Sequence, residues 1–161
     1  MIEQIVQRVW PGADARVEVL VLLARDFHQQ RALLEAPVEM RPCHNDLLNA
    51  NFIAEGDRLW IVDWEYAGMG DPFFDLGNFA VNHELDAEGE RLLLESYGSG
   101  DLEALILMRF MSDFREAMWG VVQQAISTLD FDFRAYADEH FERLERTAGE
   151  PRFRAALGLS S

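Results

Sequence analysis

A short polar stretch between residues 43 and 51 holds side chains that could do acid–base and metal chemistry. One residue separates His44 from Asp46, and Asn51 follows after four more; Asp63 then ends an apolar run twelve residues later. Phosphoryl transfer needs a carboxylate that orients the attacking hydroxyl, and a positioned acid–base group contributes about 10²- to 10⁴-fold to a rate. Asp46 fits that role, whereas Asn51 and Asp63 offer the oxygen ligands that Mg²⁺ prefers.

Each of these residues alone also has an ordinary explanation. A His-Asn-Asp triplet in a loop is usually turn chemistry, and both Asn49 and Asn51 could be turn residues. An aspartate after a strand often caps a helix. The ordered combination of loop, hairpin, aspartate and helices favours a kinase-like site, because context confirms a motif. We interpret His44 as a scaffold that hydrogen-bonds the loop backbone.

The elements that must position these side chains are a small hairpin and several helices. Two β-prone runs, Phe52–Ala54 and Leu59–Val62, flank Glu55-Gly56-Asp57 and predict a hairpin that returns Asp63 to the polar loop. Residues 64–75 predict an ordered loop. Apolar residues at helical spacing predict helices over residues 17–34, 74–83, 86–98, 101–127 and 133–144. We therefore expect an α+β, mostly helical fold.

Local signals predict where some of these elements end. Asp86 is a residue type that caps helix starts, and Gly98 is one that ends helices, so they should bound one helix. Gly68-Met69-Gly70 predicts a turn within the ordered loop.

The composition fits a single soluble domain over residues 1–161. The chain is 49% hydrophobic and 27% charged, and no apolar run nears the roughly 18 residues that a membrane helix needs. The start has no signal-peptide pattern, and a single cysteine, Cys43, suits a reducing compartment. We expect a cytoplasmic protein without a membrane partner.

The charged residues are strongly biased. The net charge of −15 disfavours nucleic acid as a partner and attracts cations, although acidic surfaces also simply keep proteins soluble. All 14 basic residues are arginine. A reaction that needs a lysine to grip phosphate therefore cannot be completed by this chain alone.

Two segments resemble the choline and ethanolamine kinases, within the aminoglycoside phosphotransferase and protein kinase-like superfamily. Cys43–Ile53 resembles the phosphotransferase loop of that family, and Ile61–Gly68, continuing through Asp71–Asn78, resembles its metal-binding stretch. The Asp-Trp-Glu-Tyr sequence at 63–66 points to the choline kinase branch rather than to antibiotic kinases.

A third segment, Trp119–Ser127 with Phe131 and Tyr136, resembles the helices that carry the aromatic choline pocket, and the likeness runs from about residue 17 to 146. Glu116 stands one turn before Trp119, where the family carries another aromatic residue. Ethanolamine and other small amino alcohols therefore stay open beside choline. On helical spacing alone, Trp119 and Tyr136 would be core residues.

The resemblance implies the carboxy-terminal, catalytic lobe of the kinase-like fold and a role for each matching residue. Asp46 would be the catalytic base, Asn51 and Asp63 would hold Mg²⁺, and His44 and Asp75 would brace the loop. The substrate's ammonium group would meet aromatic faces, which suit a cation. The residues implied at the substrate are Trp119, Tyr136, Phe131, Tyr66 and Glu65.

A complete kinase of this type is about twice as long and begins with a β-rich lobe that grips ATP through a flexible loop and a strand lysine. No segment here fills those roles, so we expect a catalytic lobe without its ATP-binding lobe, weak or inactive by itself. Three explanations for the missing lobe are open: the chain is an excised lobe, it is a natural single-lobe protein, or a partner chain completes it. The alternative functions are a non-catalytic binding module and an aminoglycoside- or thiamine-type kinase.

Overall fold

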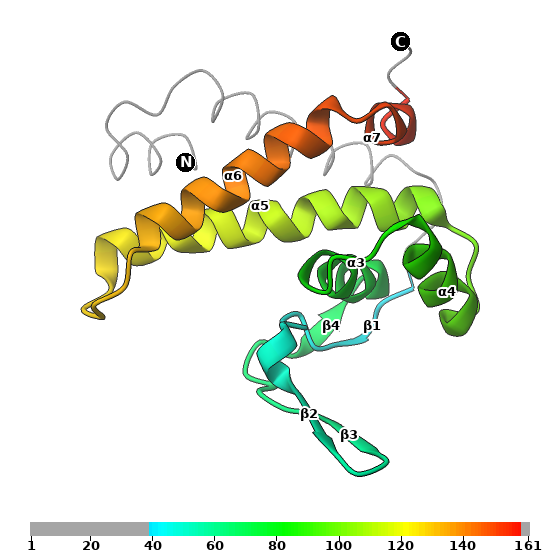
Figure 1. Ribbon diagram of the computed structural model, residues 1–161, viewed down its shortest axis with the longest axis horizontal. Helices are drawn as coiled ribbons and strands as arrows, with labels where there is room; N and C mark the ends of the chain where they lie inside the picture. The colour runs from blue at the N-terminus through cyan, green and yellow to red at the C-terminus, as the bar shows by residue number, and fades with distance from the viewer. Residues whose placement is uncertain (1–38, 159–161) are drawn as a thin grey trace. The chain divides into compact units, whose positions relative to one another are not determined.

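A computed structural model describes residues 39–158 of the chain (Figure 1). These residues belong to two compact units, whose border lies between Ser112 and Asp113 inside the long helix α5, Leu102–Ile126. Residues 39–112 are called the loop unit and residues 113–158 the helical unit. The fold is α+β and mostly helical, as the sequence predicts. The helix predicted over residues 17–34 lies outside the described residues.

Two small antiparallel sheets frame the polar loop in the loop unit. Strands β2, Phe52–Glu55, and β3, Arg58–Ile61, form the predicted hairpin, with Phe52 opposite Ile61. Strands β1, Arg41–Cys43, and β4, Gly68–Gly70, form the second sheet, with Cys43 opposite Gly68. A short 3₁₀ turn, η1, covers Asn49–Asn51 at the end of the polar loop.

The turn predicted at Gly68-Met69-Gly70 is therefore wrong. These residues form a strand because they pair with β1, which lies 25 or more positions earlier, and local residue types carry no signal for such a pairing.

Helix α3, Pro72–Asn82, starts two residues earlier than predicted. Pro72 occupies its first turn, and the Asp71 side chain accepts a hydrogen bond from the Phe73 N–H at 3.0 Å. Helix α4, Ala87–Tyr97, has the predicted ends: the Asp86 side chain accepts from the Gly89 N–H at 2.9 Å, and Gly98 follows with φ 83°.

The core of the loop unit lies between its three helices. Ala80, Leu94 and Leu105 come from α3, α4 and α5, and the half-buried Phe73, Leu76, Leu85 and Leu93 pack around them. At Gly77 the backbones of α3 and α5 touch directly, because an added Cβ would lie 2.5 Å from the Met108 carbonyl carbon. The hairpin is joined to α3 where Phe52 meets the rings of Phe79 and His83.

The helical unit contains the second half of α5, helix α6, Phe133–Gly149, and helix α7, Pro151–Ala156. Figure 1 shows α6 running back alongside the second half of α5. Gly120 permits this approach, since a Cβ there would lie 3.0 Å from the Ala137 Cβ. Helix α6 extends five residues beyond the predicted end, and the short α7 was not predicted.

Within residues 39–158, each helix is too short or too polar to cross a membrane.

Candidate active site

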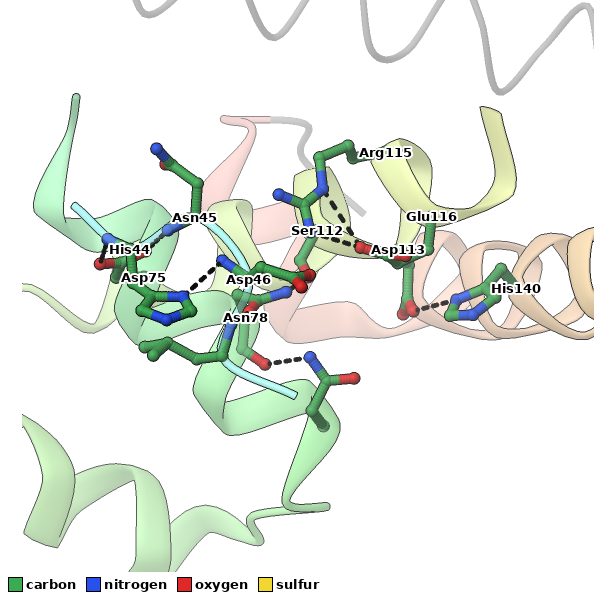
Figure 2. A network of polar contacts seen from close by, with 12 residues as sticks. His44, Asn45, Asp46, Asp75, Asn78, Ser112, Asp113, Arg115, Glu116 and His140 are labelled. Carbon is green, nitrogen blue, oxygen red and sulfur yellow. Dashed lines mark hydrogen bonds and ion pairs between the residues drawn. The ribbon is translucent and has the colours of Figure 1, made fainter. Parts of the chain in front are cut away.

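Asp75 holds the start of the polar loop from the first turn of α3. Its Oδ2 accepts a hydrogen bond from the His44 N–H and its Oδ1 from the Asn45 N–H, both at 2.7 Å (Figure 2). A carboxylate that accepts two backbone N–H groups makes strong, charge-assisted bonds. The two bonds join the loop to α3. Burial raises the pKa of the neighbouring Cys43 thiol, and the Asp75 charge raises it further.

His44 connects the polar loop to the strand that leads to Asp63. Its Nδ1 accepts a hydrogen bond from the Asp46 N–H at 3.2 Å, so the proton of the neutral ring is on Nε2. Nε2 then donates to the Val62 carbonyl at 2.9 Å. The buried ring also meets the edge of Trp64, with ring centres 4.6 Å apart. His44 thus joins the polar loop to the residue that precedes Asp63 through two hydrogen bonds.

Asn51 contacts Asp46 twice through one amide nitrogen. Its Nδ2 donates to the Asp46 carbonyl at 2.8 Å and lies 3.3 Å from the carboxylate Oδ2. Because the nitrogen faces Asp46, the amide oxygen points away from it. The Val62 N–H donates to the Asn51 carbonyl at 3.0 Å, which extends the β2–β3 ladder by one pair. Asp63 therefore directly follows Val62, the residue that pairs with Asn51.

The backbone at Asp63 turns sharply away from β3. Its φ is 63°, a left-handed conformation that side-chain-bearing residues rarely adopt and that aspartate tolerates better than most. Such outliers concentrate at functional sites. The residue is exposed and follows directly on Val62, whose backbone pairs with Asn51 of the polar loop.

The donor atoms of Asn51 and Asp63 fit a magnesium ion. Mg²⁺ is commonly held by one or two protein oxygen ligands and completes its shell with water and substrate phosphates. Among residues 39–158, no cluster of three His, Cys, Asp or Glu side chains could hold a metal ion. An ion at this site would take most of its ligands from outside the protein.

The aromatic residues predicted to bind substrate lie in both units. Trp119, Phe131 and Tyr136 gather in the helical unit: the Tyr136 ring centre lies 5.6 Å from Trp119 and 6.1 Å from Phe131. Trp119 and Phe131 are exposed, so this cluster is not a sealed core. Tyr66, with its neighbour Glu65, is exposed in the loop unit, where its carbonyl accepts from the Asn45 side chain at 3.0 Å.

A buried carboxylate lies beside this aromatic cluster. The Tyr136 hydroxyl donates to the Glu116 Oε2 at 2.7 Å, and Arg115 pairs with the other carboxylate oxygen. Burial raises the pKa of Tyr136, and the charge of Glu116 raises it further. Where the family resemblance implies another aromatic ring, this chain places an acid that fixes the Tyr136 phenol.

The sequence of the chain also matches a known family as a whole. A family model described as the phosphotransferase enzyme family matches residues 4–122, which is most of the chain.

The chain belongs to the phosphotransferase enzyme family.

Individual members of the family are similar to this chain over part of their length. The chain is 38% identical over 85 residues to the protein LicA of Haemophilus influenzae, covering 53% of this chain and 30% of LicA. It is 31% identical over 161 residues to human ethanolamine kinase 2, covering 83% of this chain and 41% of that protein.

Among solved structures, a choline/ethanolamine kinase family protein from Mesorhizobium loti matches with a TM-score of 0.79 and 30% identity. That match covers 99% of this chain and 57% of the other. The chain therefore spans less than two thirds of the length of each of these three proteins.

Sequence reasoning missed several polar residues that the structure describes. Asn78 hydrogen-bonds the loop amide of Leu47, and its only sequence signal is its position one turn after Asp75. In the helical unit, buried Asp113 accepts hydrogen bonds from His140 Nδ1 at 3.0 Å and from Arg143 Nε at 2.9 Å. The sequence could have indicated this contact, because His140 and Arg143 are three positions apart and so lie on the same face of α6.

Proposed function

We propose that the protein transfers a phosphoryl group from ATP to the hydroxyl of a small cationic alcohol of the choline or ethanolamine class. One observation carries the proposal: a single Asn51 amide holds Asp46 by its carbonyl and its carboxylate, while the strand ladder sets Asp63 beside them. The proposal assigns the acid–base role to Asp46 and the two oxygen ligands to Asn51 and Asp63. The similarity to ethanolamine kinase 2 and to the Mesorhizobium loti protein supports the same function.

In this proposal Asp46 orients the substrate hydroxyl and accepts its proton as the oxygen attacks the phosphoryl group. Asn51 and Asp63 hold Mg²⁺, which when bound neutralises phosphate charge. His44 and Asp75 keep the loop backbone fixed, so that the Asp46 carboxylate does not have to be reordered at each turnover.

The proposed recognition of the alcohol uses the aromatic cluster. A quaternary ammonium group has no N–H to donate, so aromatic faces such as those of Trp119, Tyr136 and Phe131 are its natural partners. Buried Glu116 and the net charge of −15 add a favourable potential for any cation. We also assign Tyr66 and Glu65, which lie in the loop unit, to substrate binding.

We also propose that this chain by itself is a weak catalyst. It contains no lysine to grip the ATP phosphates, and those residues would have to come from another segment or chain.

An ADP-release assay of the protein with ethanolamine, choline and other amino alcohols tests the function. We expect turnover with at least one cationic alcohol and none with aminoglycosides or thiamine. Calorimetry with choline and, separately, with Mg²⁺–ATP decides between an enzyme and a binding module. Binding of choline without binding of Mg²⁺–ATP, together with no turnover, would contradict the enzyme assignment.

Replacing Trp119 by leucine should raise KM for choline by about 2- to 30-fold, since each cation–π contact contributes about 0.5–2 kcal/mol. Leucine keeps the site apolar, so only the aromatic face is lost. The neutral carbon isostere of choline, dimethylbutanol, should show little change in KM. Trp60→Leu, the same substitution at an exposed hairpin residue, is the matched control. An equal rise in KM for both alcohols would contradict cation recognition by Trp119.

A further inference from the structure

Asn78 is completely buried, and both ends of its side-chain amide are hydrogen-bonded. Its Oδ1 accepts from the Leu47 N–H of the polar loop, and its Nδ2 donates to the Ser112 Oγ at 2.9 Å (Figure 2). Ser112, on α5, is also completely buried. All three residues belong to the loop unit. A neutral buried network of this kind is stable only when its polar atoms are paired.

The two partners of Asn78 permit one orientation of its amide. The Leu47 N–H is a donor and must face the amide oxygen, and the Ser112 oxygen accepts from the amide nitrogen. A flipped amide would set two N–H groups against each other at Leu47. The contact between α3 and α5 at Gly77, the preceding residue, keeps Asn78 within reach of Ser112.

Asn78 completes the hydrogen bonding of four consecutive loop amides. Asp75 accepts from the amides of residues 44 and 45, the His44 ring accepts from that of Asp46, and Asn78 accepts from that of Leu47. The backbone is therefore held immediately before and immediately after Asp46. Without Asn78, the peptide that follows Asp46 would be held only through its carbonyl, which accepts from Asn51 Nδ2 at 2.8 Å and from the Leu48 N–H at 2.9 Å. Its N–H end could then shift, and the Asp46 carboxylate would move with it.

We propose that Asn78 is a positioning residue for Asp46, and that the hydrogen bond to Ser112 holds the Asn78 side chain in the place from which it acts. The inference rests on the proposed function, because it takes Asp46 as the catalytic base. It adds an uncharged fixing point for the loop on α3, the helix that also carries Asp75, and Ser112 of α5 supports this point.

Asn78→Ala tests the proposal by two independent readouts. Hydrogen exchange at the Leu47 amide should become at least about tenfold faster, because the amide loses its acceptor. The kcat of the folded protein should fall by about 10- to 100-fold, the range expected when a catalytic group is misplaced by about 1 Å. KM for the alcohol should change by less than about threefold, since Asn78 is assigned no contact with substrate.

Variants of Ser112 and Leu94 allow the proposal to be tested even if Asn78→Ala folds poorly. Ser112→Ala should lower kcat by about 3- to 10-fold, and Ser112→Thr, which restores a hydroxyl, should recover most of it. Leu94→Ala is the control for lost stability, because it opens a cavity in the core of the same unit away from the loop. Its kcat per folded molecule should match that of the unaltered protein.

The proposal is overturned if Asn78→Ala leaves Leu47 exchange unchanged, or if Leu94→Ala lowers kcat as much as Asn78→Ala does. Failure of the proposed function has a different signature. In that case Asp46→Asn would keep full turnover, although Leu47 exchange would still respond to Asn78→Ala.

Discussion

Asp46→Asn is expected to lower kcat by about 10²- to 10⁴-fold, the contribution of a positioned acid–base group. Asparagine has nearly the same shape, and its side-chain oxygen can still accept the weak contact from Asn51 Nδ2 that Asp46 accepts at 3.3 Å. The backbone contacts of the loop do not involve the replaced atoms. Turnover should therefore fall without a large loss of stability, as measured by ADP release and thermal unfolding in parallel.

Asp57→Asn is the matched control for this experiment. Asp57 is exposed in the turn of the β2–β3 hairpin, so the same chemical change is made in the same unit outside the polar loop. Its kcat should stay within about twofold of the original, as expected for a surface substitution. If Asp46→Asn also keeps turnover within that range, Asp46 is not the base.

Gly77→Ala should destabilise the loop unit by about 1–3 kcal/mol or more, the usual cost of overpacking a tight contact. The new Cβ would lie 2.5 Å from the Met108 carbonyl carbon and 2.7 Å from the Arg109 nitrogen. These are backbone atoms of α5 that cannot move aside, so the two helices must separate. Urea unfolding of the variant measures the loss directly.

Gly149→Ala is the comparison that isolates the packing effect. Gly149 ends α6, and a Cβ there would meet no atom within 4 Å. Alanine favours a helix over glycine by up to about 1 kcal/mol, so this variant should be neutral or slightly more stable. Equal stability of the two variants would show that α3 and α5 are not in backbone contact at Gly77.

The parts of the fold that are encoded by neighbouring residues were predictable from the sequence. The hairpin follows from two β-prone runs around Gly56, and α4 from Asp86 and Gly98, since each signal acts within a few residues. The pairing of β1 with β4 was not predictable. Gly68-Met69-Gly70 contains two glycines, which are typical of a turn, and only the distant partner strand makes the segment a strand.

The same distinction applies to the candidate site. The spacing of His44, Asp46 and Asn51 indicates chemistry because the motif itself is local. The link from Asn78 to Ser112 joins residues 34 positions apart, and the Glu116–Tyr136 hydrogen bond joins residues 20 positions apart. Both depend on which helix faces pack together, so no spacing rule within one segment could indicate them.

The backbone N–H groups of residues 44–47 are already hydrogen-bonded, so they are not available to bind an anion. A glycine-rich phosphate loop works by pointing its free N–H groups at the nucleotide. Here those donors already serve the side chains of Asp75, His44 and Asn78. In the proposed reaction, the negative charge on the transferred phosphoryl group would have to be balanced by positive charge brought to the loop, because the N–H groups of residues 44–47 already have acceptors.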